Sequence, residues 1–436
     1  MNISKRIASC VGCALVAFLA TACGGRGAAD SAEGSASLGG GLGSAAPPIA
    51  ADPPGSVRVN NTLYVPLTGD LQPSSFAGIP IAQQTDEQLA ESLRPVMMQA
   101  DSESGTHYFI GANPATDVVQ AARHSHLGTF ATPSSLGFGT DANSGLRPQW
   151  FFDPSNSGQP IEADDSSADN TNTFPFNAID FVKAFGGSVF CTAENVDQNT
   201  ILTAAHCVNK GGTWTSNPVN FTPGALGSGG SVTSSPFGTF PNTQGSWCYN
   251  ITVPSAWTSG SCPKPPGQVG ETDGCEQFDF ATVDFRPCGN ATIQNWFGLA
   301  INEANLPSVH LDGYPGFYTF SGSPPDPVAG TQFPGCGANT NPTGAFPFLC
   351  GASGPAVTEN SVTIESGSNV GSPGFSGGPW WATNPPGLSG TLVMGIDSGE
   401  AAFARFSTCG FNTCFRNFGR WIESTAWSFI QAHTEL

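Results

Sequence analysis

Three short motifs carry side chains that together could perform acyl transfer. Thr203–Cys207 contains His206, Gly374–Pro379 contains Ser376, and Asp279 stands between Phe278 and Phe280. Acyl transfer by a serine needs a base that takes the hydroxyl proton, a carboxylate that fixes the tautomer of that base, and donors that stabilise an oxyanion. The motifs follow each other in the order His, Asp, Ser. We therefore predict a catalytic triad of His206, Asp279 and Ser376.

The glycines around Ser376 favour the same chemistry. A glycine-rich turn lets the chain fold so tightly that two backbone N–H groups point at one place. We assign the oxyanion donors to Gly374 and Ser376. Cys191 lies 16 positions before Cys207, and a disulfide between them would clamp the segment that presents His206. In the chain-entropy model a loop of this size contributes about 3 kcal/mol.

At these motifs the sequence resembles the trypsin-like serine proteases, and among them the bacterial glutamyl endopeptidases. The resemblance covers about residues 161–433. The segments that carry it, besides the His and Ser motifs, are Phe174–Ile179, Gly212–Trp214, Asn220–Gly224, Pro236–Thr239, Val253–Trp257 and Gly313–Gly316. It implies an all-β, chymotrypsin-like double β-barrel of two six-stranded antiparallel barrels. It further implies a triad in the cleft between the barrels, and secretion with a removable pro-segment.

Two departures from the family concern activation and the carboxylate. Phe375 precedes the nucleophile, where trypsin-like zymogens carry an Asp that pairs with the freed N-terminus. Phe cannot form that ion pair, so we expect local packing to shape the oxyanion loop. The interval from His206 to Asp279 is long, and Asp273 and Asp284 are rival carboxylates. We choose Asp279 because its Asp-aromatic-Ala context matches the family.

A third departure concerns substrate preference. Asp397 stands where the resemblance implies a His that helps to bind the substrate's glutamate. A carboxylate in that pocket would repel Glu and favour Lys or Arg, whereas an Asp397 turned to solvent would leave selection to pocket shape. Val370 is apolar where trypsins carry their pocket Asp. The backbone of Ser398, Gly399 and Glu400 is expected to pair with substrate as an added strand, with the Ser398 hydroxyl near Asp279.

Short apolar runs separated by Gly, Pro, Asn and Ser predict many strands after residue 174. The strand candidates are Phe174–Phe190, Thr200–Ala205, Val219–Pro223, Asp279–Phe285, Ser308–Leu311 and Thr391–Ile396. Trp421–Ala432 has no Gly or Pro, and its apolar residues recur at helical spacing, so it predicts a C-terminal helix. Asp86–Ala100 shows helical spacing as well, and Val57–Leu71 alternates.

The N-terminus predicts export. Residues 1–22 combine Lys5 and Arg6 with an apolar run and read as a signal peptide. Cys23 then suits lipidation. Lipidation of Cys23 would leave ten cysteines after the signal peptide, an even number that suits disulfides. Plain secretion is the alternative. Residues 23–56 are a low-complexity linker, 57–155 a pro-region and 156–436 the protease domain. The expected location is therefore extracellular, or anchored at the bacterial envelope by a lipid on Cys23.

Composition limits the partners. A net charge of −19 argues against nucleic acid. We expect protein or peptide substrates, a monomer, no cofactor and no metal site. His124–His126 and the carboxylates Asp164, Asp165 and Asp169 lack the surroundings of a metal site. By local spacing, Cys336–Cys350 and Cys409–Cys414 are further disulfide candidates, and Cys248, Cys262, Cys275 and Cys288 pair among themselves in an unspecified order.

Two other function classes compete with an endopeptidase. A binding or adhesion module on an inactive protease fold would agree with Phe375 and a lipid anchor at Cys23, but the intact triad opposes it. An esterase of the α/β-hydrolase type would have the order Ser, Asp, His, which this chain does not follow.

Overall fold

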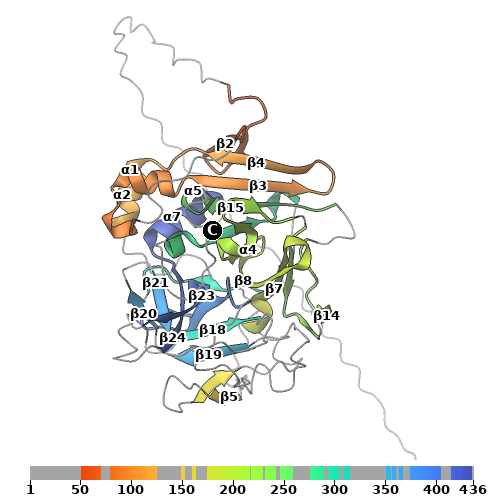
Figure 1. Ribbon diagram of the computed structural model, residues 1–436, viewed down its shortest axis with the longest axis vertical. Coiled ribbons are helices and arrows are strands. Elements are labelled where there is room, and N and C mark those ends of the chain that lie inside the picture. Colours follow the sequence, from red (N-terminus) through yellow and green to blue (C-terminus); the bar gives the residue numbers. More distant parts are fainter. Residues whose placement is uncertain are drawn as a thin grey trace, which may run out of the picture. The chain divides into compact units, whose positions relative to one another are not determined.

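A computed structural model gives the architecture of the chain (Figure 1). It describes residues 51–69, 79–124, 149–152, 160–163, 174–216, 218–228, 231–241, 246–258, 275–288, 293–303, 306, 309–314, 350–354, 356–359, 363–366, 374–403 and 414–434. Asp52–Leu436 forms one compact unit. None of the helices in these ranges has the length and apolar character needed to cross a membrane. The signal-peptide interpretation of residues 1–22, Cys23 and most of the linker fall outside the described residues.

The first sheet has ten strands in the order β1-β2-β4-β3-β15-β16-β9-β8-β7-β12. Six of them follow residue 174, as the double-barrel prediction requires. These six are β7 (Ile179–Ala184), β8 (Val189–Asp197), β9 (Thr200–Thr203), β12 (Asn220–Pro223), β15 (Cys248–Pro254) and β16 (Ala281–Asp284). The other four come from the N-terminal segment and extend the sheet beyond β15. They are β1 (Val57–Val59), β2 (Thr62–Pro66), β3 (Pro95–Asp101) and β4 (Gly105–Gly111).

The central strands of this sheet are buried along their whole length. Every residue of β9 and β16 is buried, and Ile201, Leu202, Ala281 and Val283 have no exposed surface. Polar residues of these strands are buried as well, among them Thr203 and Thr282, so both faces of β9 and β16 are covered. The run of apolar residues before His206 therefore places the chain in the middle of the sheet.

The N-terminal segment contains two helices, α1 (Asp86–Ser92) and α2 (Thr116–His124). A capping box starts α1: the Thr85 side chain accepts from the Gln88 N–H, and the Gln88 side chain accepts from the Thr85 N–H. The prediction of helical structure through Ala100 is wrong, because the chain enters β3 at Pro95. Proline disfavours helical backbone conformation at the residue that precedes it. Val96, Met97 and Met98 are fully buried in β3, so an apolar run buried on both faces imitated helical spacing.

The second sheet has eight strands. Seven are in the order β19-β18-β22-β23-β24-β21-β20, and β17 pairs in parallel with β23. Their bounds are β17 (Gly298–Leu299), β18 (Val309–Gly313), β19 (Cys350–Gly354), β20 (Ala356–Glu359), β21 (Thr363–Ser366), β22 (Pro379–Thr383), β23 (Thr391–Phe403) and β24 (Cys414–Trp421). The predicted C-terminal helix is present as α7 (Ser424–His433). Glu423 caps it, since its carboxylate accepts from the N–H groups of Thr425 and Ala426.

The remaining described elements are three two-stranded sheets and seven short helices. They are the pairs β5 (Gln149–Phe152) with β6 (Pro160–Ala163), β10 (Asn209–Lys210) with β11 (Thr213–Trp214), and β13 (Leu226–Ser228) with β14 (Ser231–Ser234), and the short helices η1 (Ile81–Gln83), η3 (Phe176–Ala178), η4 (Phe185–Gly187), α4 (Ala205–Val208), α5 (Ser255–Thr258), η5 (Cys275–Phe278) and η6 (Arg286–Cys288). The all-β prediction and the C-terminal helix are confirmed. The first sheet exceeds six strands because four strands of the N-terminal segment join it.

Candidate active site

His206 and Asp279 meet because their strands are neighbours. His206 lies in α4, directly after β9, and Asp279 stands just before β16. β9 and β16 pair antiparallel with Thr203 opposite Ala281, which brings the end of one beside the start of the other. Asp279 is fully buried, and its Oδ2 lies 2.8 Å from His206 Nδ1. Its Oδ1 accepts from the His206 backbone N–H at 2.9 Å, so the carboxylate holds both the ring and the backbone of this residue.

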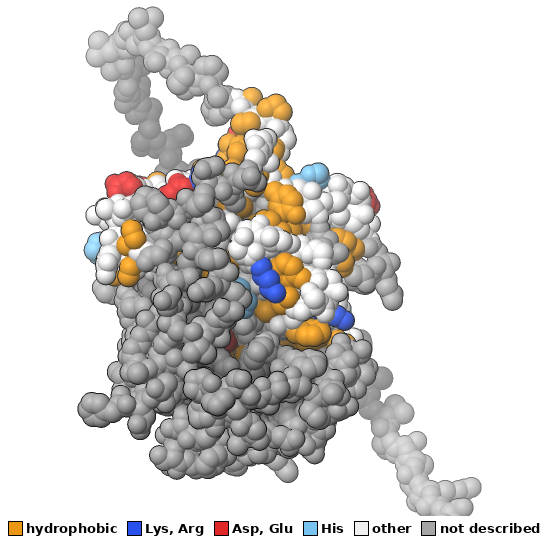
Figure 2. All heavy atoms as spheres, viewed as in Figure 1, with side chains coloured by type: hydrophobic (Ala, Val, Ile, Leu, Met, Phe, Trp, Pro, Cys, Tyr) orange, Lys and Arg blue, Asp and Glu red, His pale blue; other side chains and the backbone are white. Residues whose placement is uncertain are grey.

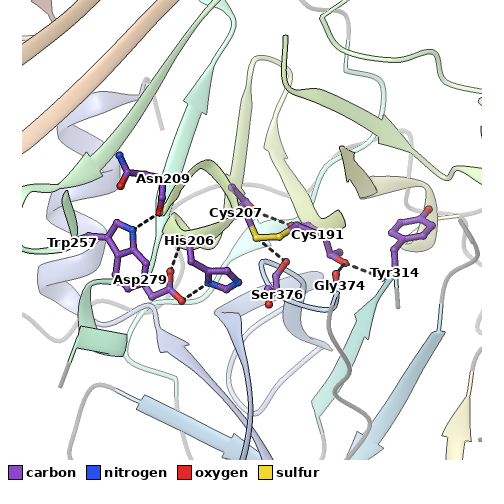
Figure 3. Close-up of a disulfide and its surroundings, with 11 residues drawn as sticks. Cys191, His206, Cys207, Asn209, Trp257, Asp279, Tyr314, Gly374 and Ser376 are labelled. Atoms are coloured by element: carbon purple, nitrogen blue, oxygen red, sulfur yellow. Dashed lines mark hydrogen bonds and ion pairs between the residues drawn. A yellow bond between two sulfur atoms is a disulfide. The ribbon is translucent and has the colours of Figure 1, made fainter. Parts of the chain in front are cut away.

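Ser376 lies on a loop that is docked onto β8. The Thr192 N–H of that strand donates to the Ser376 carbonyl at 2.8 Å, and the Thr192 hydroxyl donates to the Gly374 carbonyl at 2.7 Å. In Figure 3 the His206 ring lies between Asp279 and Ser376. The loop that carries Ser376 is therefore fixed by the same sheet that carries His206.

Close backbone approach explains the glycines after Ser376. Gly377 has φ of +86°, and a Cβ there would overlap the carbonyl oxygen of Thr192 and the hydroxyl of Thr203. The Gly377 N–H donates to the Asp397 carbonyl at 2.6 Å, and the Asp397 N–H donates to the Gly378 carbonyl at 2.8 Å. This turn is thus pressed between β8, β9 and β23, where no side chain fits.

Phe375 packs inward in place of the ion-pairing Asp. Its side chain is 1% exposed and sits against Gly313, where a Cβ would lie 2.8 Å from its ring. The expectation that local packing shapes this loop agrees with that burial.

A disulfide joins Cys191 of β8 to Cys207 of α4, with their Cα atoms 6.0 Å apart. It ties the strand that holds the Ser376 loop to the helix that holds His206 (Figure 3). Within the described part of the chain, Cys191, Cys207 and His206 are close enough to share a metal ion. Both sulfur atoms are committed to each other, so this group offers no thiolate. Cys248 is also disulfide-bonded.

Of the two rival carboxylates, the structure describes one. Asp284 is bound to Arg286, whose Nε lies 2.8 Å from its Oδ1. Asp273 lies outside the described residues. Among the described carboxylates, Asp279 is the one hydrogen-bonded to His206.

Three carboxylates on β7, β8 and β23 are fully buried: Asp180, Glu194 and Asp397 have no exposed surface. Asp180 and Glu194 accept no hydrogen bond from any described residue. Burial raises the pKa of Asp180 well above its usual range. Burial, and then the negative charges of Asp180 and Asp397, raise the pKa of Glu194 in the same direction. Burial therefore favours the neutral form of both acids.

The substrate-preference residues divide into described and undescribed ones. The hypothesis that Asp397 turns to solvent is wrong, because its side chain is fully buried and lies near Glu194. Ser398 is also buried, and its hydroxyl makes no hydrogen bond to Asp279 or to any other described group. β23 has an irregularity between Asp397 and Gly399 and continues through Glu400. Val370 lies outside the described residues.

Comparison with known proteins agrees with the motifs. Residues 165–226 match the Trypsin family model. This trypsin-like segment spans β7 to β12 and includes Cys191, His206 and Cys207. The predicted resemblance to trypsin-like serine proteases is confirmed. No curated protein matches the chain.

Two solved structures are similar over most of their own length. A Glu endopeptidase in complex with MPD is 18% identical and covers 60% of this chain and 92% of its own, with a TM-score of 0.38. The protease Anisep from Arthrobacter nicotinovorans is 21% identical and covers 59% of this chain and 96% of its own, also with a TM-score of 0.38.

The sequence did not indicate the contacts of several supporting residues. Thr192 bridges β8 to the Ser376 loop and also accepts from the Tyr314 N–H at 2.8 Å. Trp257 donates to the Asn209 carbonyl at 2.8 Å, and its ring centre lies 6.4 Å from that of His206. Such contacts join segments that are distant in the chain, so no local sequence pattern predicts them.

Proposed function

We propose that this chain is an exported serine endopeptidase that hydrolyses peptide bonds through an acyl-enzyme. His206 is the base, Asp279 its orienting carboxylate and Ser376 the nucleophile. The observation that carries the proposal is the buried Asp279 carboxylate 2.8 Å from His206 Nδ1, beside a docked, glycine-lined Ser376 loop.

The chemistry follows from this arrangement. Because Asp279 accepts from Nδ1–H, Nε2 is the nitrogen left to take the Ser376 hydroxyl proton. Ser376 Oγ attacks the substrate carbonyl, and the N–H groups of Gly374 and Ser376 stabilise the oxyanion. His206 returns the proton to the leaving amine. Water then attacks the acyl-enzyme with His206 again as base, which releases the acid and restores Ser376.

For specificity we propose that Asp397 supplies a negative charge to the primary pocket and that Val370 contributes an apolar wall. The backbone of Ser398–Glu400 would pair with the extended substrate. Cleavage after Lys or Arg should then exceed cleavage after Glu. A close opposite-charge pair at an effective dielectric near 20 gives about 4 kcal/mol before desolvation. Asp397→Asn should lose the basic preference without gaining an acidic one, measured by sequencing the cut sites of a peptide library. Clean cleavage after Glu by the parent would remove Asp397 from the pocket.

For processing we propose removal of residues 1–22, with lipidation of Cys23 or plain secretion, and cleavage near residues 155–161 to give a protease domain of 156–436. Export would place the enzyme outside the cell or on the envelope, acting on proteins or peptides as a monomer. N-terminal sequencing of the active species and mass spectrometry of Cys23 test these steps.

The direct test of activity is labelling by a fluorophosphonate, which reacts quickly only with an activated serine. The parent should label and cleave peptides, and Ser376→Ala should do neither while it stays folded. A folded parent that does not label would instead agree with a binding or adhesion module.

A further inference from the structure

The segment predicted to be a pro-region is built into the protease sheet. We call residues 52–69 and 79–124 the N-terminal region. Its strand β3 pairs antiparallel with β15 over seven residues, from Asp101 opposite Cys248 to Pro95 opposite Pro254. Figure 1 shows β3 and β4 beside β15. Without this region, the edge of β15 that β3 covers would lose its pairing partner.

The buried face of the region is continuous with the main core. Val96, Met98 and Ala100 belong to the same apolar cluster as Ile251 and Val253. The outer surface differs, because Figure 2 shows acidic side chains over α1, where Glu87 is exposed. The region therefore has one face suited to water and one that is part of the protease interior.

The region also holds the C-terminal helix. Asn60 donates through Nδ2 to the carbonyl groups of Gln431 and Ala432, each at 3.2 Å, and to that of Thr434. The Tyr64 hydroxyl is hydrogen-bonded to His433 Nδ1. These bonds satisfy carbonyl groups at the end of α7 that have no partner within the helix.

Two contacts reach the supports of the His206–Asp279 pair. Gln277 stands two residues before Asp279; its Nε2 donates to the Ile79 carbonyl at 2.7 Å and its Oε1 accepts from the Ile81 N–H at 2.7 Å. Ser255 starts the short helix that carries Trp257, and its hydroxyl donates to the Glu91 carbonyl at 2.5 Å. The N-terminal region thus contacts both segments behind the catalytic pair.

We infer that the N-terminal region is a permanent part of the protease, which stays bound as a second chain after cleavage near residues 155–161, and that Gln277 is the positioning residue through which it fixes Asp279. This inference rests on the proposed function, since it gives Gln277 its role through Asp279. It differs from a removable pro-segment in one physical respect. Cleavage cuts one connecting segment, whereas the seven-residue strand pairing and the core contacts remain.

Retention is tested in the full chain with a recognition site for a sequence-specific protease inserted between His124 and Gln149. After cutting, the two fragments should co-elute in size-exclusion chromatography and separate only in denaturant. An N-terminal fragment that elutes apart from a folded, fluorophosphonate-reactive protease domain would overturn the inference. Labelling of the uncut chain is measured in parallel, so that a failure of the proposed function appears as no labelling whatever the elution shows.

Positioning is tested with Gln277→Met, which removes both hydrogen bonds at nearly constant size. Gln84→Met is the matched control. Gln84 also donates to the Ile79 carbonyl, at 2.6 Å, but it lies within the N-terminal region. We expect kcat to fall about tenfold or more in Gln277→Met with KM little changed, since a misplaced orienting carboxylate weakens the transition state rather than substrate binding. Gln84→Met should stay within about twofold. Equal kcat losses in the two variants, or none in Gln277→Met, would refute the positioning role. If Gln277→Met does not fold, Gln277→Asn and Gln84→Asn replace the two variants, with the same expected difference in kcat.

Discussion

His433 should make the protein less stable in mild acid. Its ring is buried under Tyr64 at the end of α7, and burial lowers its pKa from 6.5 to about 3. Between these two values the unfolded chain binds a proton at this residue and the folded protein does not. The free energy of unfolding therefore falls as the pH falls through that window.

The size of the effect follows from the two pKa values. From pH 7 to pH 5 the difference in proton binding lowers the free energy of unfolding by about 2 kcal/mol, and most of a total near 5 kcal/mol is lost by pH 3. The Asp284–Arg286 ion pair lies at the same end of α7, because Arg286 also donates to the His433 carbonyl.

The assay is urea unfolding at pH 7, 6 and 5 in a Ser376→Ala background, which prevents self-cleavage. Between pH 7 and pH 5, the free energy of unfolding of His433→Gln should fall by about 2 kcal/mol less than that of the parent. Tyr64→Phe is the control: it removes the hydrogen bond but leaves the ring buried, so it should lower stability at every pH and keep the parent's slope. If His433→Gln keeps the parent's full loss, burial of His433 is not the source of the acid sensitivity and the reasoning fails.

Three further changes test other parts of the site. Asp279→Asn should lower kcat by about four orders of magnitude through the wrong His206 tautomer; a near-normal peptidase rate would return the assignment to Asp273 or Asp284. Glu194→Gln should raise the thermal midpoint at pH 8 and change it little at pH 4. A carboxyl whose pKa is raised in the folded protein makes that protein less stable as the pH rises above the pKa of the carboxyl in the unfolded chain. An equal shift of the midpoint at both pH values would contradict this. Gly377→Ala should abolish fluorophosphonate labelling and lower the melting temperature, whereas Gly387→Ala, at a similar φ of +82° with open space around it, should keep labelling.

The sequence alone predicted the motifs, some of the strands and the C-terminal helix. Each rests on local information: a glycine-rich turn at Ser376, an apolar run of strand length before His206, and helical spacing in 421–432. These patterns predict local backbone structure well because the backbone conformation they favour needs few distant partners.

Local patterns failed where burial on both faces removed the distinction between helix and strand. Val96–Met98 kept helical spacing in the sequence, but the strand β15, more than a hundred residues away, gave β3 its hydrogen bonds and its cover. The pro-region interpretation came from the resemblance to a protease family, which carries no information about which sheet this segment joins in this chain.

Only the tertiary structure decided what surrounds the candidate site. It buried the Asp397 side chain near Glu194, which excludes the solvent-facing alternative that the sequence left open. It also brought Gln277 to Ile79 and Thr192 to the Ser376 loop. The physical reason is the same in each case: hydrogen bonds and charge interactions across a sheet depend on which strands become neighbours, and that choice is made by burial of the whole core rather than by any one segment.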